Sequence, residues 1–345
     1  MENKHIQNQY DNDMGTAVLL VNFGGPKDLN EVKPFLYNLF SDPAIINLPF
    51  AFLYRKPLAW LISSLREKAS KEMYKKVSTE NSQIPITHEQ KDKLQEMFII
   101  NKLKVNVFVG LRYSHPCIED VLNEIKLKGY ERVIVLPLFP QFSFTTVGSV
   151  NKVVNNWHKK NKDFKIFFIS NWYEDEDYIE SFVSLIRNEL KDMDLRSTEI
   201  IFSAHSIPIS NVKNGDPYEY QIKKTAEAII QKLDWKKKWH IAYQSKLGPV
   251  KWLEPSTDKV IEEIAKRNKN ANVLVIPISF VSENVETIYE IGMLYKEIAD
   301  KAGIKRFVRV PALNEDKYLI QALYNQVVSC LDKHNMQIKE LMHMS

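Results

Sequence analysis

The amino-acid sequence predicts an α/β protein with two similar domains, each a parallel sheet flanked by helices, and a cleft between them. Short apolar runs that suit strands alternate with amphipathic runs that suit helices, a pattern typical of parallel sheets. The 345 residues are enough for two domains of ordinary size. The expected strands are residues 16–22, 105–111, 132–138, 164–169, 198–203, 240–244, 271–277 and 306–310, and the expected helices include 116–128, 218–233, 257–266 and 283–300.

The order of these runs repeats in the two halves of the chain. TAVLLVNFGGP is similar to STEIIFSAHSIP, KVNVFVGLRYSHPCIEDVL to WHIAYQSKLGPVKWLEPSTDKVI, and ERVIVLPLFPQFSFTTVGSV to NANVLVIPISFVSENVETIYEI. Three matched units in one order predict two related domains whose strand ends meet at one ligand cleft. We expect a flexible tail at 1–15, a first domain at 16–160 and a second at 161–345 ending in a helix, with the boundary in the lysine-rich stretch 159–165.

Composition excludes several classes of protein. Apolar and charged fractions of 44% and 26% describe a soluble globular chain, and a net charge of +4 is too small to indicate a nucleic-acid partner. Cys117 and Cys330 are far apart with no CxxC spacing, so zinc ribbons and disulfide frameworks are not expected. The polar first fifteen residues have no apolar targeting region. These features predict a cytoplasmic protein.

His205 is the first candidate for chemistry. It follows an apolar strand-like run in IFSAHSIPISNVKNGDPY, so it belongs at the carboxyl end of a strand, where open α/β sheets hold their ligands. An imidazole with a reference pKa of about 6.5 can accept a proton or bind a metal near neutral pH. A histidine at such a place can also serve only in capping or in the core.

The last unit of the second half supplies carboxylates. Ser282 is a plausible N-cap, which places Glu286 in the first two turns of the following helix. Glu290 lies four residues later, so both carboxylates are expected on one helical face. The alternative is that acidic residues at this place interact only with the helix dipole.

Strand ends of the first half carry Phe23 with two following glycines, and Arg112 with Tyr113. The glycines permit a ligand to approach the backbone closely, but neither the GxGxxG nor the Walker spacing is present. Arg112 and Tyr113 suit a ligand with carboxylates and a flat body. A surface ion pair of Arg112 is an equally good interpretation.

The segment at 48–65, LPFAFLYRKPLAWLISSL, is strongly apolar but is interrupted by Arg55, Lys56 and Pro57. A helix that spans a bilayer is therefore not expected. Its aromatic and basic residues suit a segment lying at a membrane surface, and a helix packed on the core is the alternative.

Several motifs together resemble the ferrochelatases, which insert ferrous iron into a porphyrin. LLVNFGGP, LRYSHP, PQFS, FSAHSIPISNVKNGDPY, YQSKLGPVKWLEP and IPISFVSENVETIYE are similar to blocks of that family and occur in the family's order. The resemblance implies two Rossmann-like domains around a porphyrin cleft. It also implies that the apolar segment 48–65 is a membrane-associated lip.

The same resemblance implies roles for particular residues. His205 and Glu286 match the essential histidine and glutamate, the positions usually assigned to catalysis and to the metal. The residues that match positions near the macrocycle are Arg112, Tyr113, Phe139, Trp252 and Phe280. Phe23 and Glu290 are also expected to contact the substrate.

Four departures from the family pattern accompany these matches. Asn284 stands where the family often has histidine, and Leu294 stands where a third carboxylate would follow Glu286 and Glu290. The stretch 78–83 replaces a glycine-rich loop, and Phe23 stands where some members carry a tyrosine. The end of the chain has no cysteine after Cys330, so no iron–sulfur cluster or other resident cofactor is expected.

The expected reaction is insertion of Fe²⁺ into protoporphyrin IX to give protohaem with release of two protons. We expect His205 to take protons and help position Fe²⁺, while Glu286 and Glu290 form a polar path; the reverse assignment of His205 and Glu286 is also open. Coproporphyrin or sirohydrochlorin as substrate, a metal other than iron, and a porphyrin or haem carrier without catalysis remain alternatives.

Overall fold

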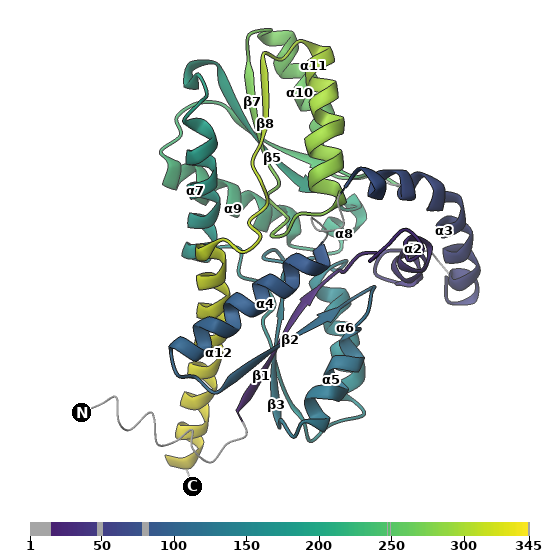
Figure 1. Cartoon of the computed structure of the whole chain (residues 1–345), viewed down its shortest axis with the longest axis vertical. Helices are drawn as coiled ribbons and strands as arrows, with labels where there is room; N and C mark the ends of the chain where they lie inside the picture. Colours follow the sequence, from purple (N-terminus) through teal and green to yellow (C-terminus); the bar gives the residue numbers. More distant parts are fainter. Residues whose placement is uncertain (1–14, 47–50, 78–82, 247, 249, 344–345) are drawn as a thin grey trace.

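The structure is a computed structural model that describes residues 15–46, 51–77, 83–246, 248 and 250–343. It contains two parallel sheets of four strands, each covered by helices (Figure 1). Residues 1–14, most of the expected tail, lie outside the described residues. The first sheet has the order β2-β1-β3-β4 and the second has the order β6-β5-β7-β8. Because the two orders are equivalent, the repeat predicted from the sequence is confirmed.

All eight expected strands form. They are β1 Thr16–Asn22, β2 Val105–Leu111, β3 Arg132–Pro137, β4 Lys165–Phe168, β5 Thr198–His205, β6 Trp239–Gln244, β7 Asn272–Ile276 and β8 Arg306–Arg309. The described helices are α2 Val32–Ser41, α3 Ala51–Lys76, α4 Gln83–Ile100, α5 Ile118–Leu127, α6 Val147–His158, α7 Glu176–Leu190, the 3₁₀ turn η2 Leu195–Ser197, α8 Ile209–Lys213, α9 Tyr218–Leu233, α10 Thr257–Arg267, the π-helix η3 Glu286–Tyr295, α11 Lys296–Ala302 and α12 Lys317–His343.

The register brings functional strand ends to one edge of each sheet. Asn22 at the end of β1 pairs with Leu111 at the end of β2. In the second sheet His205 at the end of β5 pairs with Gln244 at the end of β6. The residues that follow these strands therefore gather at the carboxyl edge, as parallel pairing requires.

The boundary between the domains lies later than the sequence indicated. Strand β4 pairs in parallel with β3, from Arg132 with Lys165 to Val135 with Phe168. It belongs to the first sheet, so a division between residues 160 and 161 cuts this sheet one strand too early. The lysine-rich stretch marks the exposed turn between α6 and an edge strand, and an exposed turn has the same polar composition as a linker.

One apolar core joins the two domains. It contains Val18 and Ile134 from the first sheet together with Phe202 and Leu274 from the second. Helix α12 packs against α4 and β3 of the first domain and against α7 of the second. Figure 1 shows α12 running beside the first domain, with one end meeting α7 of the second. This shared core fixes the carboxyl edges of the two sheets relative to each other.

Helices α2 and α3 project from the side of the first domain (Figure 1). Within the described residues, none of the helices combines the length and apolar character needed to cross a bilayer. The start of the apolar segment, residues 48–50, lies outside the described residues. The described part of that segment forms the first half of α3.

Candidate active site

A cavity of about 860 Å³ lies at the carboxyl edges of the two sheets. Both domains contribute to its wall, and helices α2 and α3 form one side of it. The wall is largely aromatic and aliphatic, with a few ionisable groups, which is the usual character of a site for a flat organic ligand. From the set expected on sequence, the cavity is lined by Phe23, Phe139, His205, Trp252, Phe280, Glu286 and Glu290.

His205 enters the cavity from the last position of β5. Its backbone N–H donates to Ser279 Oγ at 2.9 Å, and its carbonyl accepts from the hydroxyl of Tyr218 at 2.9 Å. The ring atom Nδ1 lies 2.8 Å from the carbonyl oxygen of Ser206. A carbonyl can only accept, so this contact places a proton on Nδ1 and leaves Nε2 as the neutral ring's free acceptor. The imidazole is therefore arranged to take a proton or to bind a metal ion.

Glu286 is the first residue of the π-helix η3. Burial raises the pKa of its carboxyl above the ordinary value of 4.5; the interaction with His205 acts in the opposite direction, and Glu290 adds to the increase. Glu286 and His205 both line the cavity. The pair supplies one oxygen and one nitrogen donor for a divalent metal.

Glu290 also lines the cavity, but its carboxylate is held by four donors. Oε1 accepts from the backbone N–H of Ser245 and from the hydroxyl of Tyr295, both at 3.0 Å. Oε2 accepts from the hydroxyl of Ser245 and from Gln244 Nε2, the latter at 3.3 Å. With its lone pairs engaged, Glu290 is a fixed negative charge beside Glu286, placed on the same side of the helix as the spacing predicted.

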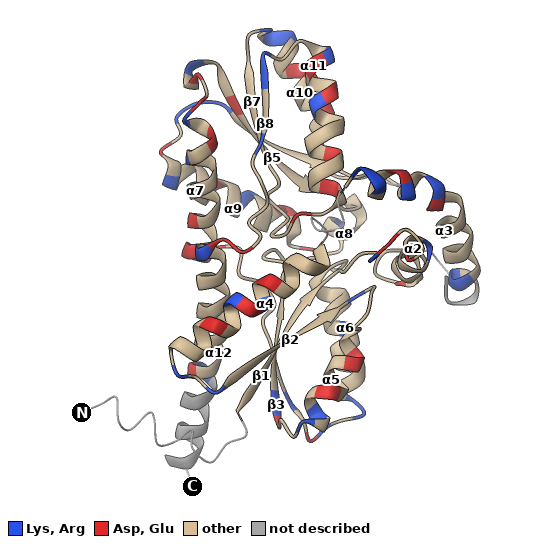
Figure 2. Ribbon diagram, in the orientation of Figure 1, with Lys and Arg blue, Asp and Glu red and all other residues tan. Residues whose placement is uncertain are grey.

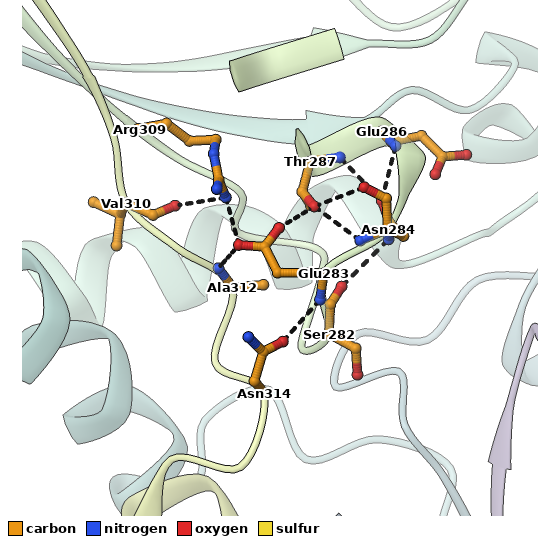
Figure 3. Close-up of polar contacts among 9 residues, drawn as sticks. All are labelled: Ser282, Glu283, Asn284, Glu286, Thr287, Arg309, Val310, Ala312 and Asn314. Carbon is orange, nitrogen blue, oxygen red and sulfur yellow. Dashed lines mark hydrogen bonds and ion pairs between the residues drawn. The ribbon is translucent and has the colours of Figure 1, made fainter. Parts of the chain in front are cut away.

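Asn284 caps the helix, and the expectation that Ser282 does so is wrong. Asn284 Oδ1 accepts from the backbone N–H groups of Glu286 at 2.9 Å and Thr287 at 3.0 Å (Figure 3). Ser282 instead accepts at Oγ from Gln90 Nε2 of α4, at 3.1 Å. The helix begins at Glu286, so a cap at Ser282 would lie too far upstream to reach its free N–H groups.

Arg112 and Tyr113 do not line the cavity, contrary to the sequence-based expectation. Arg112 Nη2 lies 2.6 Å from Asp42 Oδ2, and the Tyr113 hydroxyl donates to the same oxygen at 2.8 Å. Asp42 follows α2 and is almost fully buried, with its side chain 1% exposed. The Tyr113 ring lies behind Phe23, with centroids 5.2 Å apart. These two residues therefore support the wall instead of forming it.

Several lining residues were not predicted from the sequence. Arg66, Ser70, Met73 and Tyr74 come from α3, and Lys246 follows β6. Burial and the charge of Glu286 raise the pKa of the Tyr74 hydroxyl. The spacing of Arg66, Ser70 and Met73–Tyr74 places these residues on one face of a helix, and this was their only signal in the sequence. Nothing in the local sequence indicates that this face lies against the cavity.

The donor set of the cavity is small. Among the described residues, no group of three or more His, Cys, Asp or Glu side chains is arranged to hold a metal ion. Cys117 and Cys330 are both free cysteines.

Comparison with known proteins decides the family. A family profile described as ferrochelatase matches residues 15–331. The chain belongs to the ferrochelatase family. This ferrochelatase-family chain is 41% identical over 330 residues to the ferrochelatase of Synechococcus elongatus, covering 94% of this chain and 85% of the relative. It is 40% identical over 333 residues to the ferrochelatase of Trichodesmium erythraeum, covering 95% and 86%.

Solved structures place the ferrochelatase-family chain in the two-domain chelatase fold. The sirohydrochlorin chelatase SirB from Bacillus subtilis subspecies spizizenii, in complex with cobalt, superposes with a TM-score of 0.55 and covers 94% of this chain and 98% of its own. SirB from Bacillus subtilis with Fe3+ gives a TM-score of 0.54 and the same shares. The identities are 10% and 11%, so these likenesses concern the fold alone.

Proposed function

We propose that this protein inserts Fe²⁺ into protoporphyrin IX to form protohaem, with release of two protons. The observation that carries the proposal is that His205 and Glu286 face one aromatic-walled cavity large enough for a macrocycle. Membership of the ferrochelatase family supports the identity of the metal and the class of macrocycle. The macrocycle and Fe²⁺ are both substrates, so the proposal includes no resident cofactor or iron–sulfur cluster.

The reaction needs a base on one side of the macrocycle and an exit for protons. Neutral His205 can take a pyrrole proton at Nε2 while its Nδ1–H stays on the Ser206 carbonyl. Its second role is to help position Fe²⁺, together with ionised Glu286. Glu290, fixed beside Glu286, keeps negative charge on the path by which cations enter or leave.

The aromatic residues of the wall suit the flat faces of the macrocycle. Phe23 and Phe139 meet edge to face with centroids 5.1 Å apart, and Phe280 lies 6.3 Å from the ring of His205. Binding energy from these faces can be used to bend the macrocycle so that its nitrogen lone pairs become accessible.

Basic residues on the wall suit the substrate's two carboxylates. The described part of the chain places Arg66, Lys75 and Lys246 on the cavity. Lys75 is 2.7 Å from Glu72, and Lys246 is 3.4 Å from Glu254, whereas no ion pair of Arg66 occurs within the described residues. A small number of cations favours protoporphyrin over coproporphyrin and sirohydrochlorin, which carry more carboxylates.

We also propose that α3 rests on a membrane surface, from which an apolar porphyrin could enter the cavity. Four large side chains between Tyr54 and Leu65 are exposed: Tyr54 39%, Trp60 58%, Leu61 48% and Leu65 74%. Figure 2 shows that the charged residues of α3 are concentrated in its later part, toward the second domain. We place the protein in the cytoplasm, at the inner face of the membrane.

Sedimentation with vesicles tests the membrane proposal. The wild-type protein should co-sediment with vesicles of phosphatidylcholine and phosphatidylglycerol, whereas the variant Trp60→Ser/Leu65→Ser should remain in the supernatant. Leu127→Ser is a matched control, because Leu127 is 88% exposed on α5 and lies outside the lip. Equal sedimentation of all three proteins would remove the membrane contact from the proposal.

An anaerobic assay tests the catalytic proposal. Wild-type protein with protoporphyrin IX and Fe²⁺ should lose porphyrin fluorescence and gain a haem spectrum. His205→Ala should abolish insertion and still bind porphyrin, while His88→Ala, which changes an exposed histidine on α4, should behave as wild type. Near-normal turnover by His205→Ala would contradict the role of this residue.

The same assay separates the competing functions. Coproporphyrin, and sirohydrochlorin with Co²⁺, are offered in parallel, and the preferred pair identifies the substrate. Tight porphyrin binding by the wild type without insertion of any metal would indicate a carrier instead of an enzyme.

A further inference from the structure

The position of Glu286 is set by the residues that precede it. Asn284 uses its side-chain oxygen to accept from the first two N–H groups of η3, at 2.9 and 3.0 Å (Figure 3). Its Nδ2 donates to the carbonyl of Ser282 at 3.4 Å, and its backbone N–H donates to Thr287 Oγ1 at 3.0 Å. Both ends of the Asn284 amide are therefore used within the protein, although the residue lies on the cavity wall.

The side chain of Glu283 connects the same turn to the segment around the end of β8. Its Oε1 lies 2.6 Å from Arg309 Nη1 and accepts from the backbone N–H of Ala312 at 3.0 Å, while Oε2 accepts from the hydroxyl of Thr287 (Figure 3). The backbone N–H of Glu283 donates to Asn314 Oδ1 at 2.9 Å. The start of η3 is thus tied to the end of β8 and to the segment that follows it.

The ion pair between Glu283 and Arg309 is packed inside the protein and does not line the cavity. The side chain of Glu283 is 9% exposed and that of Arg309 is 22% exposed, and neither lines the cavity. A Cβ added at Gly292 of η3 would lie 3.3 Å from Arg309 Nε, so glycine leaves room for the guanidinium to cross the helix. Glu283 therefore differs from Glu286 and Glu290, which reach the cavity.

We propose that Asn284, supported by the Glu283–Arg309 pair, is a positioning residue that holds Glu286 at the distance from His205 needed for metal insertion. The inference rests on the proposed function. Without the two hydrogen bonds that Asn284 Oδ1 accepts, the first turn of η3 would fray and the Glu286 carboxylate would occupy other positions. The contacts of the macrocycle with Phe23, Phe139 and Trp252 would not change, because these lining residues belong to other elements.

Steady-state kinetics with Asn284→Ala and Asn284→Ser test this proposal. The alanine variant should lower kcat by about ten- to a hundredfold, as loss of a residue that orients a metal ligand does, while KM for porphyrin stays near the wild-type value. The serine variant keeps an N-cap acceptor and should restore kcat to within about threefold. Asn268→Ala is the matched control, because Asn268 Oδ1 accepts from the N–H of Asn270 in an exposed turn away from the cavity.

A second variant tests the contribution of the Glu283–Arg309 pair separately. Glu283→Gln/Arg309→Met removes both charges together and so avoids leaving one of them buried and unpaired. It should fold, as checked by its melting temperature, and should lower kcat without raising KM for porphyrin.

The outcomes are distinguishable. A wild-type kcat in Asn284→Ala, or an equal loss in the alanine and serine variants, would overturn the positioning role. A rise in KM for porphyrin that accounts for the whole loss would overturn it as well, since it would assign Asn284 to substrate binding. If the wild-type protein binds porphyrin but inserts no iron, the proposed function itself is wrong, and this outcome is distinct from failure of the positioning role.

Discussion

The guanidinium of Arg112 is bound to the carboxylate of Asp42 through Nη2 and Oδ2, which are 2.6 Å apart. Arg112 directly follows strand β2, and Asp42 directly follows helix α2. The cavity is lined by four residues of this helix: Phe35, Leu36, Leu39 and Phe40. Asn38 of the same helix donates to the Tyr113 carbonyl at 3.1 Å. The two contacts fix one wall of the cavity to the first sheet.

Replacement of Arg112 by alanine is expected to destabilise the fold. Asp42 would remain buried with no cation, and breaking a buried ion pair by removing one partner costs about 3–5 kcal/mol. The free energy of unfolding from urea titration measures this loss. Arg112→Met/Asp42→Leu should be less destabilised than Arg112→Ala, because no unpaired charge remains. Direct binding of a substrate carboxylate by Arg112 would give the opposite pattern, with a higher KM for porphyrin and unchanged stability.

The variant Glu286→Gln is expected to be inactive and more heat-stable than the wild type near neutral pH. Burial raises the pKa of the carboxyl above 4.5 in the folded state, so the folded protein binds this proton more tightly than the unfolded chain. Keeping the group ionised above the folded pKa therefore costs stability, and this cost disappears as the pH falls below 4.5.

Melting temperatures across this pH range measure the effect. The gap between Glu286→Gln and the wild type should be widest at neutral pH and should close toward pH 4.5. A wild-type protein that is the more stable of the two at neutral pH would show that the carboxylate has a stabilising partner. The activity of the wild type should fall as the pH decreases through the raised pKa, because the protonated carboxyl cannot bind a cation.

Asp216 is expected to affect porphyrin binding more than turnover. Its Oδ2 accepts from Ser143 Oγ at 2.9 Å and from the N–H of Phe144 at 2.8 Å, and its Oδ1 accepts from the N–H of Tyr218 at 3.1 Å. Asp216→Ala would release a segment of the first domain that lines the cavity, so KM for porphyrin should rise severalfold.

The matched control for Asp216 is Asp300→Ala, which removes an exposed carboxylate paired with Lys296 at 2.7 Å. It should leave both kinetic constants unchanged. A fall in kcat of Asp216→Ala at constant KM would instead indicate that the disturbance passes through Tyr218, whose hydroxyl donates to the carbonyl of His205.

Much of the architecture follows from local sequence. The central strands β1, β3, β5 and β7 could be predicted because a strand buried on both faces needs a continuous apolar sequence, and this signal is contained within a few residues. The repeated order of strands and helices was enough to predict two equivalent sheets and one cleft. His205 could be placed at the cleft for the same reason, since the end of a parallel strand is a defined position.

Other features depend on contacts between distant segments. The sequence marks Arg112 as a cation beside a strand end, but only the tertiary structure brings Asp42 under it, 70 residues away. The domain boundary was misplaced because an exposed turn before an edge strand and a true linker have the same composition. Glu283, the residue before the cap Asn284, is bound to Arg309 at the end of β8 and to Asn314 beyond it, contacts that the local sequence does not indicate. The sequence by itself determined the order of elements and the chemistry available at their ends, because both are local properties. Which of these side chains reach the cavity was decided by tertiary structure, because each carboxylate and cation takes the partner that the packing of distant elements provides.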